Sequence, residues 1–89
     1  MKAIITVLGK DTVGIMYNVS KILAELGVNI EDVTQTILQE YFTMLMVVKI
    51  DETKSTIADL QTALNEMGEE KGLSINVQKE EIFNAMHKI

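Results

Sequence analysis

The chain has 89 residues, a formal net charge of −5 at pH 7, and no cysteine, proline or arginine. This length fits one domain spanning residues 1–89, and the lack of cysteine excludes disulfides, thiolate metal sites and cysteine catalysis. The acidic charge and the missing arginine argue against direct binding to nucleic acid, whose phosphates are contacted mainly by arginine and lysine.

The N-terminal part of the chain is organised around a loop that contains two glycines. Residues 2–8 are almost all apolar, which predicts a strand buried on both faces. The loop Gly9-Lys10-Asp11-Thr12-Val13-Gly14-Ile15 then leads into a helix, whose N-terminal N–H groups can hold a small anionic group. Spacing alone favours a tight turn in which nothing binds. Either Asp11 or Thr12 is a suitable N-cap.

The first helix is predicted from apolar residues that recur every three or four positions. Ile15, Val19, Ile22 and Leu26 form this stripe, and polar residues occupy the opposite side. Gly27 is expected to end the helix in the left-handed conformation, which glycine adopts at little cost.

Two strands follow, and the first of them changes its period. Over residues 29–39, Ile30 and Val33 cannot share one face of a regular strand, so we expect a bulge near Glu31-Asp32. Residues 41–50 are apolar on both faces, which is typical of a central strand.

The second half repeats the order of helix and strand. A helix capped by Ser55 or Thr56 is predicted from an apolar stripe that ends near Met67, and Gly72 should close it. Residues 73–78 alternate between apolar and polar, so this strand should show one face to water. A short amphipathic helix is expected from Glu80.

The predicted order of elements indicates an α+β fold. Strand, helix, strand, strand, helix, strand, with right-handed crossovers, gives a ferredoxin-like βαββαβ sandwich with an additional C-terminal helix. The first and third strands would be central, and the second and fourth would be edges. The sheet face away from the helices would carry an apolar patch, which the terminal helix or a second subunit should cover.

The second strand also predicts self-association. Residues 33–39 have no charge and no proline, so the edge lacks the usual protection against pairing with another strand. A homodimer could form through this edge, or through the apolar sheet faces instead.

Nothing in the sequence assembles a catalytic or metal site. The single histidine, His87, has no nucleophile to activate, and the acidic pairs Glu69-Glu70 and Glu80-Glu81 fit a solvated surface. We therefore expect no enzyme activity, no cofactor and no metal. Without a signal-peptide pattern or an apolar run of membrane-spanning length, we expect a cytoplasmic protein with no membrane contact.

The loop from Gly9 to Ile15, followed by Leu26-Gly27-Val28-Asn29-Ile30, resembles the opening of an ACT domain, the small-molecule-sensing module of amino-acid metabolism. The ending Glu80-Glu81-Ile82-Phe83-Asn84-Ala85-Met86-His87 resembles small stand-alone ACT proteins related to the glycine-cleavage transcriptional repressor. The resemblance implies that an asparagine opening the second strand contacts an amino-acid ligand together with the first loop, often that of the neighbouring subunit. The ligand-binding residues it implies are Lys10, Asp11, Thr12, Val13, Gly14, Ile15, Asn29 and Ile30.

The function implied by the resemblance is that of a homodimeric regulator. It would sense a small amino acid or related metabolite and modulate a partner protein. Two alternatives stay open, namely a ligand-free interaction module in the same fold and an acylphosphatase-like hydrolase. Acylphosphatases need an arginine to hold phosphate, and this chain has none.

Overall fold

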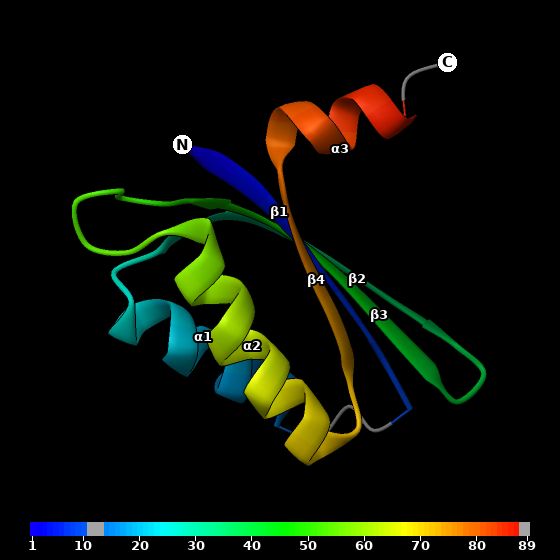
Figure 1. Ribbon diagram of the computed structural model, residues 1–89. Coiled ribbons are helices and arrows are strands. Elements are labelled where there is room, and N and C mark those ends of the chain that lie inside the picture. Colours follow the sequence, from blue (N-terminus) through cyan, green and yellow to red (C-terminus); the bar gives the residue numbers. More distant parts are fainter. Residues whose placement is uncertain (11–13, 88–89) are drawn as a thin grey trace.

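The computed structural model describes residues 1–10 and 14–87, which form one four-stranded antiparallel sheet and three helices (Figure 1). The elements are β1 (Lys2–Gly9), α1 (Ile15–Glu25), β2 (Asn29–Leu38), β3 (Tyr41–Lys49), α2 (Ile57–Lys71), β4 (Ser74–Lys79) and α3 (Glu80–His87). The strand order is β2-β3-β1-β4, and α1 and α2 lie side by side on one face of the sheet. The predicted ferredoxin-like sandwich with a C-terminal helix is confirmed, as are the central and edge positions of the strands.

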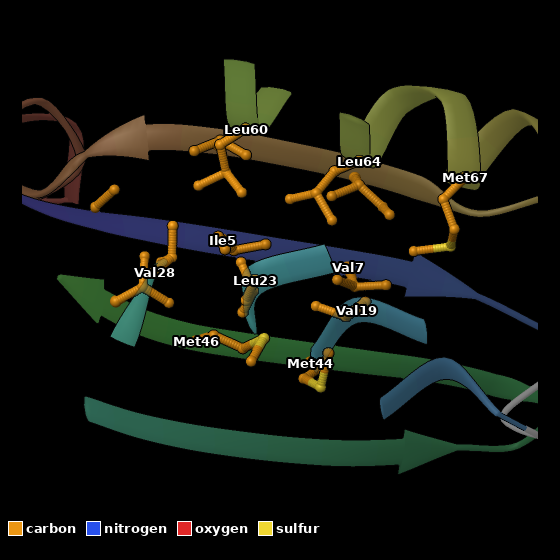
Figure 2. Close-up of a cluster of buried hydrophobic side chains, with 14 of the residues drawn as sticks. Ile5, Val7, Val19, Leu23, Val28, Met44, Met46, Leu60, Leu64 and Met67 are labelled. Carbon is orange, nitrogen blue, oxygen red and sulfur yellow. The ribbon is translucent and has the colours of Figure 1, made fainter. Parts of the chain in front are cut away.

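The core lies between the sheet and these two helices because β1 and β3 both turn apolar residues toward them. Ile5 pairs with Met46 and Val7 pairs with Met44, and all four side chains are buried (Figure 2). The helices close over them with residues spaced at three or four, as amphipathic helices do. The helical contribution to the core consists of Ile15, Val19, Leu23, Leu60, Leu64 and Met67.

The ends of α2 follow the sequence prediction, and those of α1 follow it in part. Thr56 forms a capping box with Asp59, which satisfies two backbone N–H groups at the start of α2. Gly72 closes the same helix with φ 73°. Helix α1, in contrast, has Gly14 as its N-cap residue, with φ 76° and no side-chain cap hydrogen bond. The predicted cap at Asp11 or Thr12, both outside the described residues, is therefore wrong, because Gly14 occupies the N-cap position.

The bulge in β2 is confirmed. The register of β2 against β3 shifts between Ile30 and Asp32, so Glu31 is the additional residue. Beyond this point the pairing is regular to Leu38, and Gln39 enters the hairpin turn with φ 57°. As a consequence of the bulge, Asn29 pairs with Lys49 on one face, whereas Ile30 packs against the core on the other.

The sheet face opposite α1 and α2 is only partly covered. Helix α3 packs against β1 and β4, and it leaves Leu8 46% exposed and Tyr41 43% exposed. On β1, Ile4 is buried from this side but Leu8 is not, so burial on both faces is confirmed only for the middle of the strand. The terminal helix is therefore not the cover for the whole apolar patch.

The turn after α1 yields the first testable prediction. Gly27 has φ 71°, and a Cβ added there would lie 2.8 Å from Cδ of Lys54. We expect Gly27→Val to lower the free energy of unfolding by about 1–2 kcal/mol, because a β-branched residue is disfavoured in the left-handed region. Urea denaturation followed by circular dichroism measures the change.

Gly27→Asn is the matched control, since asparagine tolerates this backbone conformation and should cost less than valine. An unchanged urea midpoint for Gly27→Val would contradict the role of Gly27 as a left-handed terminator of α1.

Candidate functional site

The two halves of the predicted ligand site lie at opposite ends of the sheet within one protomer. Strands β1 and β2 are both antiparallel to β3, so they run parallel to each other. Asn29 at the start of β2 is consequently aligned with the start of β1, whereas the first loop follows the end of β1 at Gly9. A strand rises about 3.3 Å per residue, so the two halves are on the order of 20 Å apart. One chain alone does not bring them together.

The first loop contributes a positively charged side chain and the start of a helix. Lys10 Nζ lies 3.9 Å from Oε1 of Glu40 and 5.6 Å from the centre of the Tyr41 ring, so it leans over the β2–β3 hairpin. Gly14 begins α1, and its carbonyl accepts a hydrogen bond of 2.8 Å from Nδ2 of Asn18. Ile15 is buried in the core, so its side chain is not available to a ligand. Asp11, Thr12 and Val13 lie outside the described residues.

A hollow of about 500 Å³ opens beside Asn29 at the other end of the sheet. Its volume falls within the range of about 300–1,000 Å³ that is common for small-molecule sites. Ile30, which was predicted beside Asn29 in the site, faces the core instead. The residues that line the hollow are Met1, Gly27, Asn29, Lys49, Ile50, Asp51 and Glu52.

The hollow is lined by positively and negatively charged side chains that form no ion pairs with other described residues. Lys2, which pairs with Lys49 across β1 and β3, forms an ion pair of 3.4 Å with Glu31. Neither Lys49 nor Glu52 forms an ion pair with any described residue, so both could contact a ligand. A cation, a carboxylate and the amide of Asn29 are the groups that complement a zwitterionic amino acid.

Asp51 adds a second carboxylate that is held in place from within its own loop. Its Oδ1 accepts hydrogen bonds from Thr53 Oγ1 at 2.6 Å and from the Thr53 backbone N–H at 3.0 Å. These two hydrogen bonds lower the pKa of Asp51 below its ordinary value, because they stabilise the ionised form. The residue therefore stays negative at neutral pH.

Lys49, Asp51 and Glu52 were not predicted as site residues from the sequence. Lys49 falls within the predicted central strand over residues 41–50, and Asp51 and Glu52 lie in the connection before the second predicted helix. Their position beside Asn29 follows from the register of β2 against β3, including the bulge at Glu31. An asparagine and a charged loop at the same sheet end would have been the available signal.

Among the described residues, neither a candidate metal-binding cluster nor a candidate membrane-spanning helix is present. They contain no group of three or more histidine or acidic side chains placed to hold a metal ion. No helix among them is long and apolar enough to cross a membrane.

The comparisons with known proteins agree on one family. The ACT-domain family model matches residues 2–78. A UPF0237 protein of Listeria innocua is 51% identical over 89 residues, which cover all of both chains. An ACT domain protein from Streptococcus pneumoniae has a TM-score of 0.82 at 49% identity, over 98% of each chain. A structure described as a candidate glycine cleavage system transcriptional repressor has a TM-score of 0.76 at 26% identity, over 86% of this chain and 44% of that one. The chain therefore belongs to the ACT-domain family, a regulatory ligand-binding fold.

Proposed function

We propose that the protein is a homodimeric amino-acid sensor that regulates a partner protein rather than catalysing a reaction. The observation that carries this proposal is the hollow beside Asn29, which combines two carboxylates, an amide and the ammonium of Lys49, unpaired among the described residues, within an ACT domain. The similarity to a candidate transcriptional repressor of the glycine cleavage system supports a regulatory role connected with amino-acid metabolism.

The ligand would be held by groups of opposite charge. The α-carboxylate of the amino acid would contact Lys49 and the amide of Asn29, and its ammonium would contact Glu52 or Asp51. The remaining side of the ligand would face the first loop of the second copy, with Lys10 and the N-terminus of α1. Residues from two protomers are needed because the two halves of the site are at opposite ends of each sheet.

The edge of β2 offers a way to build such a dimer. The sheet ends at β2, and the exposed side chains from Thr34 to Ile37 have no charge. Antiparallel pairing of β2 with β2 of a second copy would satisfy the unpaired backbone groups of both edges. It would also bring the Asn29 end of one protomer toward the first loop of the other.

Ligand binding by Asn29 can be tested by thermal shift against the twenty amino acids. A ligand at one hundred times its Kd stabilises the folded protein by about 2.7 kcal/mol, which raises Tm by on the order of 10–20 °C for a domain of this size. We expect at least one small amino acid to give such a shift, and we expect Asn29→Ala to abolish it with little change in the Tm of the free protein.

Asn76→Ala is the matched control, because Asn76 is an exposed asparagine on β4, the other edge strand. It should retain the full shift. If Asn29→Ala retains the shift as well, the ligand binds elsewhere. The absence of a shift with every amino acid would favour the ligand-free interaction module.

The dimer can be tested with proline at an N–H that points away from β3. The Val33 N–H donates to Oδ1 of Asp32 at 2.9 Å rather than to β3. Because N–H directions alternate along a strand, the Gln35 N–H also points outward, whereas the Thr36 N–H points toward β3. We expect Gln35→Pro to give a folded monomer by light scattering, because proline removes an edge donor but is tolerated on an edge.

Leu45→Glu distinguishes the edge dimer from a dimer through the apolar sheet faces. Leu45 is half-buried on the open face of β3, so the edge model predicts that this variant stays dimeric. A dimeric Gln35→Pro together with a monomeric Leu45→Glu would show that the subunits meet through their sheet faces instead.

A further inference from the structure

A groove of about 330 Å³ lies between α1 and α2 and is lined by residues of both helices. Its floor is apolar and consists of Ile22, Ala63 and Met67. The two helices touch each other only sparingly, because most of their buried residues point down into the sheet. The space between their outer faces is therefore open to solvent, with room for one bulky side chain.

The rim of this groove is acidic. Glu25 lies on α1, and Glu66 and Glu70 lie on α2, against one lysine, Lys21. None of these four residues forms an ion pair with another described residue. The rim therefore carries three carboxylates against one ammonium, and no ion pair among the described residues neutralises the excess negative charge.

This arrangement does not serve the stability of the helices. Glu66 and Glu70 are four residues apart, so their like charges repel. Glu25 and Glu70 lie in the last turns of α1 and α2, where the negative end of the helix dipole disfavours a carboxylate. The three rim carboxylates are therefore placed unfavourably for the isolated domain. A positively charged binding partner that neutralises them would explain this placement.

We propose that the groove between α1 and α2 docks a basic segment of a partner protein, with one bulky apolar side chain flanked by lysine or arginine. The apolar side chain would occupy the floor at Met67, and the flanking cations would contact the rim glutamates. A single metal ion does not fit, because no three acidic or histidine side chains among the described residues converge on one point. Nucleic acids and anionic lipids are repelled by the same rim.

An exposed aromatic residue extends this surface. Tyr17 is 69% exposed, and it lies on the outer face of α1 one turn before Lys21. Tyrosine is enriched at protein interfaces because it combines a large apolar area with a hydroxyl group. The ends of α1 also adjoin both halves of the proposed ligand site, Gly14 on one side and the turn before Asn29 on the other. The docking of the basic segment is nevertheless testable without any ligand.

The test is an NMR titration in which a synthetic amphipathic peptide of lysine and leucine is added to the protein. A peptide of identical composition in scrambled order is the control for simple charge attraction. We expect the largest chemical-shift changes at Ile22, Ala63 and Met67, and markedly weaker binding of the scrambled peptide. We also expect the double variant Glu66→Gln/Glu70→Gln to weaken binding by about tenfold, since each lost ion pair contributes modestly to affinity.

The double variant Glu80→Gln/Glu81→Gln, which removes the same charge from α3, is the matched control and should keep the affinity within about twofold of the unsubstituted protein. Equal losses in both double variants, equal binding of the scrambled peptide, shifts located outside the groove, or no binding at all would each overturn the proposal.

Discussion

The pairing of β1 with β3 is the interaction on which the rest of the domain depends. These strands share eight aligned residue pairs, and the pairs that face the helices are apolar along the whole length. Ile5, Val7, Met44 and Met46 provide the surface onto which both helices pack (Figure 2). The edge strands add to this centre, β4 by pairing with β1 and β2 by pairing with β3. Among the described residues, neither β2 nor β4 pairs with a further strand on its outer side, so the backbone groups of both edges remain available for pairing.

The same pairing determines where ligand-binding groups can lie. Because β3 is antiparallel to both β1 and β2, the start of β2 and the end of β1 are at opposite ends of the sheet. An amino-acid site that uses Asn29 together with the first loop must therefore draw on two copies of the chain. The uncharged stretch of β2 from Thr34 to Ile37 and Lys49 beside Asn29, which forms no ion pair with another described residue, are two independent features that this arrangement would use.

Much of the fold could be predicted from the sequence because the patterns are local. The slip in hydrophobic period at Ile30 and Val33 predicted the bulge, and Thr56 was one of the two residues predicted to cap the second helix. The start of α1 was misjudged because a left-handed Gly14 replaces a side-chain cap there, and that choice depends on how the loop enters the helix.

The composition of the candidate site was harder to predict, because it depends on contacts between distant segments. Lys49 and Glu52 come beside Asn29 only through the register of β2 against β3, which the bulge changes by one residue. The same shift places the side chain of Ile30 against the core. The register of β2 against β3 cannot be read directly from residue type and spacing along the chain.

The most direct test of the central claim, a site shared between two protomers, is the stoichiometry of mixed dimers. Asn29→Ala and Lys10→Ala protomers would be co-expressed with different tags, and the mixed dimer would be isolated and titrated by calorimetry with an amino acid that the unsubstituted protein binds. If each site combines Asn29 of one protomer with the first loop of the other, both homodimeric variants lose binding while the mixed dimer regains one intact site. The account predicts one ligand per mixed dimer. A mixed dimer that binds no ligand would contradict it, because both groups would then be required within a single protomer.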